Sequence, residues 1–259
     1  MLLAVDCGNT NIVFALYDGD IQQANWRIST EAKRSADEYL VCLSQLMALN
    51  SIAVEAVTDM IIANVVPEML PKLMGLAERG FGLVPKVVGD DNIDLGIKVN
   101  IDEPNHAGAD RLVNAVAARE LYDLPAIILD FGTATTFDLV GKKGSYEGGI
   151  IAPGVNLSVE ALYLAAARLP RLAVEPWEAD MPVLGKDTLS AMHSGIFWGY
   201  VSMVDGLIER LRRDHGSSLS AIATGGLASL FADHVRSISI VDPDLTLKGL
   251  AIIHAQNKS

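Results

Sequence analysis

One short pattern occurs twice in this chain, and the repeat constrains the fold more than any other feature. DCGNTN begins at Asp6 and DFGTAT begins at Asp130, so each has an acid, any residue, a glycine and then small or polar residues. Each follows an apolar run, LLAV in the first case and AIIL in the second. A further glycine lies at a similar distance downstream, Gly19 and Gly144. Internal self-similarity indicates a repeated structural unit.

The residues around each copy predict a meander of three strands. Residues 2–5 are apolar and lead to Asp6, NIVFALYDGD alternates and ends in the hairpin signal Asp-Gly, and IQQANWRI follows as the return strand. The second copy repeats this order with AIILDFG, TTFDLVGKKG and SYEGGIIAPG. Apolar periodicity and turn residues predict further elements. These are helices at 35–49, from Pro67, at 106–122, 154–166 and 187–213, with strands at 59–66, 86–89 and 219–226.

The order of these elements predicts an α/β fold made of two duplicated halves with a cleft between them. We expect the first half to span residues 1–105 and the second to span residues 106–259. The length of 259 residues is enough for one large or two medium domains.

Composition narrows the class of protein. The formal net charge of -12 argues against nucleic acid as a partner, because neutralising phosphates needs clustered Lys and Arg. It does not exclude phosphate ligands, which backbone N–H groups can bind. The chain has no apolar run of 18 residues and starts without a basic segment, so neither a membrane span nor a signal peptide is expected. Cys7 and Cys42 have no metal-like spacing and are expected to be buried thiols, as in a cytoplasmic protein.

The loop after Asp6 has the chemistry of a phosphate site. Gly8 lets the backbone approach a ligand, and Asn9, Thr10 and Asn11 add side-chain donors. A carboxylate cannot bind phosphate directly, but Asp6 can hold a hydrated Mg²⁺. An ordinary hairpin with turn-forming residues remains the alternative for this loop alone.

The second loop repeats this chemistry. Gly132, Thr133 and Thr135 could bind another phosphate, and Asp130 could bind a cation, whereas threonines chosen for strand propensity are the alternative. Two such loops in related halves facing one cleft favour a nucleoside triphosphate. The chain has neither a Gly-Lys-Ser/Thr phosphate loop nor a dinucleotide fingerprint, so an ATP site must come from these paired hairpins.

The segment HAGADRL at 106–112 places Asp110 and Arg111 in the first turn of a helix. Arg111 could contact an anionic group there, and Asp110 could accept a proton from a hydroxyl substrate. Alternatively, Asp110 complements the helix dipole and Arg111 makes an exposed salt bridge. His106 is the only histidine near this segment.

Two other segments allow both a structural and a functional role. In ATGGLASLF, Gly225 and Gly226 permit close approach to a nucleobase or ribose, or simply form a strand-to-helix turn. At the start of the helix expected at 187–213, Asp187 or Thr188 fits an N-cap, and Thr188 could instead offer its hydroxyl to a substrate.

Together these motifs resemble the superfamily of acetate and sugar kinases, actin and chaperone ATPases, whose duplicated domains are ribonuclease-H-like. Within it, one combination is similar to type III pantothenate kinase, in this order along residues 6 to about 228. The segments are DCGNTN, GADRLVNAVAA, DFGTATTFD with EGGIIAPG, and ATGGLA. The resemblance implies ATP-dependent phosphorylation of pantothenate to 4'-phosphopantothenate, the first step of coenzyme A biosynthesis.

The resemblance also implies roles for particular residues. Asp110 would be the catalytic proton acceptor, Asp130 would bind a monovalent cation, K⁺ or NH₄⁺, and Thr133 would contact ATP. The pantothenate site would be lined by Gly108, Ala109, Asp110, Arg111 and Thr188. The first phosphate loop would be Asp6, Cys7, Gly8, Asn9, Thr10, Asn11, Ile12 and Val13. Mg²⁺ would accompany ATP, and the family implies a homodimer with the substrate site at its interface.

One departure and two alternatives accompany this resemblance. Ile101 stands where many members have a tyrosine, three residues before Pro104, so one contributor to the pantothenate pocket is replaced. A sugar kinase of the same superfamily is the first alternative, although the Cys/His cluster of some such kinases is absent. A non-enzymatic transcriptional accessory protein is the second, although no basic reading helix is present.

Overall fold

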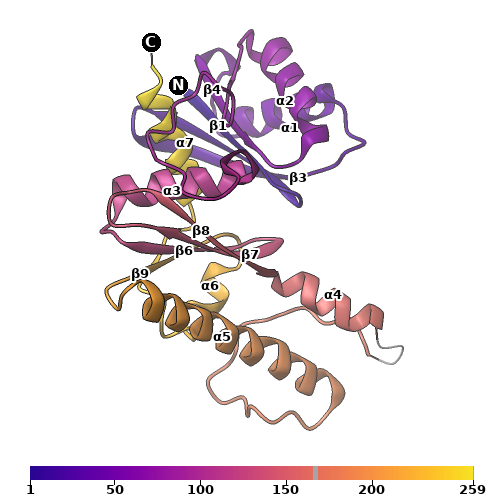
Figure 1. The fold of residues 1–259 in the computed structure, drawn as a ribbon. Coiled ribbons are helices and arrows are strands. Elements are labelled where there is room, and N and C mark those ends of the chain that lie inside the picture. The colour runs from indigo at the N-terminus through magenta and orange to yellow at the C-terminus, as the bar shows by residue number, and fades with distance from the viewer. Residues whose placement is uncertain (166–168, 259) are drawn as a thin grey trace. The chain divides into compact units, whose positions relative to one another are not determined.

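The structure, a computed structural model, describes residues 1–165 and 169–258. It divides into two compact units (Figure 1). Unit 1 comprises residues 1–120 and the C-terminal segment from Leu245, and unit 2 comprises Leu121–Asp244. The division expected from the sequence lay at residue 105, ahead of helix α3 (Ala109–Leu121). That helix groups with unit 1 because its apolar stripe packs there, a choice that periodicity alone cannot make.

Each unit contains one five-stranded sheet, and the strand order is the same in both. Unit 1 has the order β3-β2-β1-β4-β5, and unit 2 has β8-β7-β6-β9-β10. The strands of unit 1 are β1 Leu2–Cys7, β2 Asn11–Asp18, β3 Ile21–Ser29, β4 Asp59–Asn64 and β5 Lys86–Val87. Those of unit 2 are β6 Ala126–Phe131, β7 Ala134–Val140, β8 Tyr146–Pro153, β9 Ser220–Thr224 and β10 Ile240–Val241.

Strand directions confirm the repeat that the sequence predicts. In each sheet the first three strands form an antiparallel meander, the fourth strand pairs in parallel with the first, and the fifth pairs in parallel with the fourth. The two turns after the acids differ by one residue. Cys7 pairs with Ile12 across residues 8–11, whereas Phe131 pairs with Thr135 across residues 132–134.

Most of the expected helices are present with small shifts at their ends. Unit 1 has α1 Ala36–Leu49, α2 Leu70–Leu76, α3 Ala109–Leu121 and α7 Leu245–Gln256, and unit 2 has α4 Val155–Ala165, α5 Thr188–His215 and α6 Ala228–Phe231. Pro67 opens a short 3-10 turn, Pro67–Met69, before α2. A second such turn, Pro104–His106, precedes α3. Residue 166, the expected end of α4, lies outside the described residues. Within them, no helix is long and apolar enough to cross a membrane.

Alternation along β1 builds a core on each face of the first sheet. Leu3, Val5 and Cys7 join the cluster that α1 and α2 cover, whereas Leu2 and Ala4 join the cluster that α3 and α7 cover. The strand is therefore buried on both sides, which explains its continuous apolar run.

In unit 2, one face of the sheet packs on α5 and α6. The odd-numbered residues Ile127, Leu129 and Phe131 of β6 share a cluster with Phe197 of α5 and Phe231 of α6. Asp130 lies between two of these positions, so its side chain points to the opposite face of the sheet. The alternation thus separates the acid from the aromatic core below the turn.

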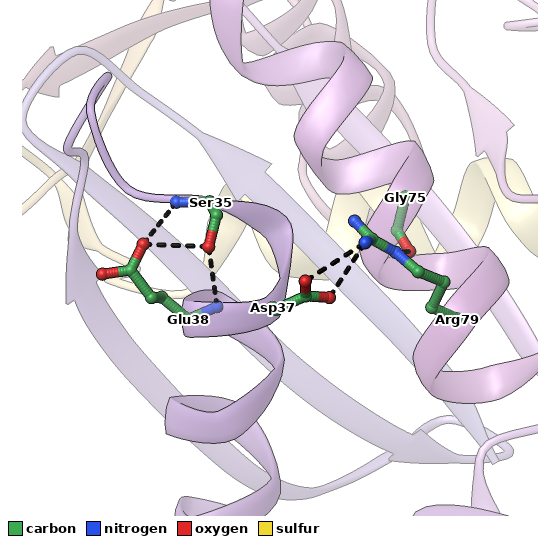
Figure 2. Close-up of polar contacts among 5 residues, drawn as sticks. All are labelled: Ser35, Asp37, Glu38, Gly75 and Arg79. Carbon is green, nitrogen blue, oxygen red and sulfur yellow. Dashed lines mark hydrogen bonds and ion pairs between the residues drawn. The ribbon is translucent and has the colours of Figure 1, made fainter.

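The start of α1 shows how local signals fix an element (Figure 2). Ser35 and Glu38 form a capping box, in which the Ser35 hydroxyl accepts from the Glu38 N–H and the Glu38 carboxylate accepts from the Ser35 N–H. These hydrogen bonds, led by the backbone one, lower the pKa of Glu38. Asp37 pairs with Arg79, at 3.0 Å, and so links α1 to the turn after α2.

Candidate functional site

Hydrogen bonds hold the turn after Asp6 in place. The Gly8 N–H donates to the Asn11 carbonyl at 3.0 Å and closes the turn. Thr30, just after β3, donates its hydroxyl to the Gly8 carbonyl at 2.7 Å and its N–H to the Thr10 carbonyl at 3.0 Å. The turn is therefore held in one shape while Thr10 stays exposed and Asp6 half-buried. Sequence reasoning did not single out Thr30, because its partners lie far away in the chain.

The residues predicted for this loop separate into two groups. Cys7 and Ile12 are fully buried, so their side chains cannot contact a ligand at the surface. Burial, with a smaller contribution from Asp6, raises the pKa of the Cys7 thiol to about 12, and the thiol stays protonated. Asn9 and Thr10 are exposed at the tip, and Asn11 is half-buried. The polar members of the motif are thus the ones that reach the surface.

Asp110 lies in the first turn of α3 with its carboxylate at the helix N-terminus. Its Oδ1 accepts from the Arg111 N–H at 2.8 Å, and the Gly108 carbonyl accepts from the Leu112 N–H. A Cβ atom at Gly108 would lie 2.6 Å from Asp110 Oδ1, so the glycine leaves room for the carboxylate. The carboxylate of Asp110 therefore complements the helix dipole, as the sequence predicted. The side chain of Asp110 is half-buried.

Other residues near the start of α3 are exposed or half-buried. His106 pairs with Glu103, and both side chains are more than 70% exposed, at 76% and 71%. Ile101, which replaces the tyrosine of many relatives, is half-buried in the irregular segment before Pro104. Ala109 and Arg111 are half-buried as well.

In unit 2, two glycines from distant segments pack against the turn after Asp130. Asp130 lies opposite Thr136 on β7 and beside Thr224 on β9. Gly225, at φ +90°, follows Thr224, and a Cβ atom there would come closer than 3.0 Å to Asp130 Oδ1. Only glycine tolerates both this backbone conformation and this contact.

The second glycine, Gly154, lies directly after β8. A Cβ atom at Gly154 would come closer than 3.0 Å to the carbonyls of Thr133 and Gly132. Thr133 and Gly132 are exposed at the tip of the turn. Three segments distant in sequence, DFGT, APG and ATGG, therefore meet around one turn, and close backbone packing explains the glycines Gly154 and Gly225 of the last two.

Thr135 does not take the role that the sequence suggested. It was expected to bind phosphate, but it is 1% exposed and its hydroxyl is hydrogen-bonded to that of Tyr200. Thr135 pairs with Phe131, so it points to the α5 face of the sheet, opposite to Asp130. Spacing alone could not reveal this, because the turn ends one residue earlier than in unit 1.

The start of α5 resolves the choice between Asp187 and Thr188. Asp187 is the N-cap, since its Oδ1 accepts from the Ser190 N–H at 2.9 Å, and this hydrogen bond lowers the pKa of Asp187. Thr188 is the first helical residue and is exposed. Its hydroxyl is therefore not used as the cap.

The acids fit a metal held partly by other molecules. Among the described residues, no group of three or more His, Cys, Asp or Glu side chains could hold a metal ion. Mg²⁺ commonly uses one or two carboxylates together with water and phosphate oxygens. Asp6 and Asp130 each offer one half-buried carboxylate at a strand end, and at Asp130 the absence of a side chain on Gly225 makes room for the carboxylate itself.

Similar solved structures show the fold class. A protein from Campylobacter jejuni assigned to the Baf family of transcriptional activators matches with a TM-score of 0.60 at 20% identity, covering 98% of both chains. A protein from Porphyromonas gingivalis assigned as an N-acetylglucosamine kinase matches at 0.54 and 14%, covering 99% of both. At these identities the likeness shows the fold alone. The expected actin-like, sugar-kinase-type α/β fold is confirmed.

Sequence relatives define the family within that class. The family model described as type III pantothenate kinase matches residues 2–210. Type III pantothenate kinases from Paramagnetospirillum magneticum and Rhodospirillum rubrum are 51% and 52% identical, each over all of this chain and over 98% and 99% of their own lengths. The chain belongs to the type III pantothenate kinase family. It is a kinase that acts on pantothenate with ATP and a divalent metal, and neither the sugar-kinase nor the transcriptional alternative is favoured.

Proposed function

We propose that this chain transfers the γ-phosphoryl group of ATP to the primary hydroxyl of pantothenate. The products are ADP and 4'-phosphopantothenate, and the reaction is the first step of coenzyme A biosynthesis. The observation that carries the proposal is the identity of about half of all residues with type III pantothenate kinases over the whole chain. A cytoplasmic location accords with the two free thiols, Cys7 and Cys42.

The proposed ATP contacts come from the two glycine turns. In the first turn, the proposed donors to phosphate are the side chains of Asn9, Thr10 and Asn11. The loop that carries them is shaped by Asp6, Gly8 and Val13 and by the backbones of Cys7 and Ile12. Thr133, exposed at the tip of the second turn, is the proposed contact there. Hydrogen bonds to a charged phosphate oxygen contribute about 1.5–3 kcal/mol each, so a few such donors suffice for binding.

The proposed cation sites are the two acids beside these turns. Asp6 would hold Mg²⁺ through water, and Asp130 would hold a monovalent cation, K⁺ or NH₄⁺. When bound, these cations would neutralise charge on the phosphates, which is the dominant need of phosphoryl transfer. The chain's own contribution is to fix the two carboxylates at strand ends, where Gly225 makes room for the carboxylate of Asp130.

The proposed base is Asp110. As the hydroxyl oxygen of pantothenate bonds to the γ-phosphorus, the bond from that phosphorus to the bridging oxygen of ADP breaks, and the hydroxyl proton passes to a carboxylate oxygen of Asp110. The Arg111 N–H holds Oδ1 at 2.8 Å and so fixes the orientation of the carboxylate. Gly108, Ala109, Arg111 and the exposed Thr188 are the proposed pantothenate contacts. General-base assistance of this kind is typically worth about 10²–10⁴-fold.

A homodimer with the substrate site at its interface completes the proposal. Large apolar side chains lie exposed on α4 and on the segment that leads into α5. They are Leu157, Leu164, Met181, Val183, Leu184 and Leu189, between 39% and 80% exposed. Thr188 lies within this sequence stretch, next to Leu189. We propose that these exposed apolar residues form an interaction surface and that a second copy of this chain is the partner.

An ATP-consumption assay tests the proposal. The protein should convert ATP to ADP only when pantothenate is present, and K⁺ or NH₄⁺ should increase the rate. N-acetylglucosamine in place of pantothenate serves as the control for the sugar-kinase alternative. Folded protein that fails to turn over pantothenate under any of these cation conditions would exclude the proposed reaction.

A further inference from the structure

Tyr200 of α5 reaches β7, the strand that follows the Thr133 turn, and β8, the strand that pairs with β7. Its side chain is buried, with the residue 6% exposed, and its hydroxyl donates to the Pro153 carbonyl at 3.2 Å. The same hydroxyl is hydrogen-bonded to Thr135 Oγ1. Thr135 is near the start of β7, directly after the turn, and Pro153 is the last residue of β8. One oxygen atom therefore connects both strands at the end where the turn emerges.

The direction of these hydrogen bonds follows from their chemistry. A carbonyl oxygen only accepts, so the Tyr200 proton is used on Pro153. Thr135 must then donate its own proton to the Tyr200 oxygen. Burial raises the pKa of Tyr200, which keeps this hydroxyl protonated. The result is an ordered chain from Thr135 through Tyr200 to Pro153, in a buried site where an unmade hydrogen bond is costly.

These hydrogen bonds affect the exposed turn through Gly154. Gly154 follows Pro153 directly, and its backbone packs so closely below the Thr133 carbonyl that a Cβ atom could not fit. Fixing Pro153 therefore fixes the backbone on which Thr133 rests, and fixing Thr135 holds the other end of the turn. The Tyr200 ring is itself held by Phe231, at 5.1 Å between ring centroids, and by Phe131, at 6.3 Å.

We propose that Tyr200 is a positioning residue for the nucleotide-binding turn at 132–134. Its hydroxyl holds Thr133 and Gly154 in the arrangement that binds ATP, although it lies on the far side of the sheet from Asp130. The inference rests on the proposed role of Thr133 as an ATP contact. Tyr200 therefore affects the affinity for the nucleotide and takes no part in the proposed proton transfer to Asp110.

The test removes single hydroxyl groups and measures ADP binding by calorimetry. Tyr200→Phe should weaken ADP binding by about tenfold, the scale of one lost hydrogen bond. The KM for ATP should rise by a similar factor, with kcat and the KM for pantothenate changed by less than about twofold. Thr135→Val should reproduce the effect, and Thr135→Ser, which keeps the hydroxyl, should behave as the unaltered protein. Thr135→Val leaves the Tyr200 ring in place, so it decides the matter if Tyr200→Phe does not fold.

A matched control separates positioning from general loss of stability. Tyr17 is also buried, at 3% exposed, and its hydroxyl donates to Gln22 Oε1 at 3.0 Å in unit 1. Tyr17→Phe should lower the melting temperature without changing ADP affinity. Unaltered ADP affinity in Tyr200→Phe, or an equal loss in Tyr17→Phe, would overturn the inference. Since ADP binding needs no pantothenate, a protein that binds ADP but does not phosphorylate pantothenate would count against the proposed reaction and not against Tyr200.

Discussion

Short side chains and glycines carry the proposed chemistry at the scale of single residues. Asp6 and Asp130 are the penultimate residues of their strands, and each is followed two residues later by a glycine. Gly154 and Gly225 matter because a side chain at either position would meet the turn around Thr133 or the carboxylate of Asp130. The motifs could be read from the sequence, whereas the contacts between them needed the folded chain.

Asp110→Asn should reduce kcat by at least about 100-fold, because an amide cannot accept the hydroxyl proton. The fold should persist, since the amide oxygen can still accept from the Arg111 N–H. Steady-state kinetics and circular dichroism would measure the two properties. Asp102→Asn, at an exposed acid before the helix, is the control and should keep the turnover of the unaltered protein. Near-normal turnover in Asp110→Asn would remove Asp110 from the mechanism.

Gly154→Ala should weaken ATP binding and lower stability together. The new methyl group would overlap the carbonyls of Thr133 and Gly132, and overpacking of this kind typically costs about 1–3 kcal/mol. Urea unfolding and the KM for ATP would measure it. Gly206→Ala in α5 is the matched control, because its Cβ atom would meet only Arg210 at an ordinary 3.5 Å. The steric argument fails if both variants bind ATP equally well.

At the scale of elements, α7 shows how a helix distant in sequence completes unit 1. Its Gly249 lies so close to the Val113 carbonyl of α3 that no side chain fits between the two helices. Thr246 donates its hydroxyl to Asn114 Oδ1 at 2.8 Å, so the same pair of helices also shares a partly buried polar contact. His254, 2% exposed, lies near Asp59 of β4, with 3.4 Å between His254 Nε2 and Asp59 Oδ1.

The docking of α7 should make stability depend on pH. Burial, and then the charge of Lys86, lower the pKa of His254 from 6.5, although Asp59 acts in the opposite direction. The folded protein therefore favours neutral His254. The contribution of His254 to the free energy of unfolding is complete above the pKa that this histidine has in the unfolded chain. It is lost as the pH falls through the lower pKa of the folded protein. Urea midpoints should decrease from about pH 7.5 to about pH 5.5.

His254→Gln should make this pH dependence shallower, because the substituted side chain does not titrate. His106→Gln, which removes an exposed histidine paired with Glu103, should leave it unchanged. The same slope in His254→Gln and in the unaltered protein would assign the effect to other groups.

At the scale of the whole molecule, duplication is the main organising feature. Two sheets with the same strand order each place an acid and a glycine turn at the end of their first strand. The chain passes from unit 1 to unit 2 after α3 and returns before α7. Each unit therefore contains one copy of the motif, and the proposed base Asp110 belongs to unit 1.

The proposed homodimer gives the whole-molecule prediction. Light scattering should give twice the chain mass of 27.7 kDa, and Leu164→Asp on α4, at a residue 72% exposed, should shift the mass towards one chain. Turnover of pantothenate should fall with dissociation, because the proposed substrate site lies at the interface. Leu49→Asp, on α1 and 81% exposed, is the control and should stay dimeric. An unaltered protein that is monomeric at working concentrations would contradict the proposal.

The sequence by itself determined the repeat, most of the strands and helices, and the family, because these depend on local periodicity, turn chemistry and ordered motifs. Only the tertiary structure decided the contacts made at long range. It grouped α3 with unit 1, turned Thr135 away from the exposed turn and brought Tyr200, Gly154 and Gly225 to it. Those outcomes depend on strand register and on side-chain packing between distant segments, and neither is encoded in the spacing of nearby residues.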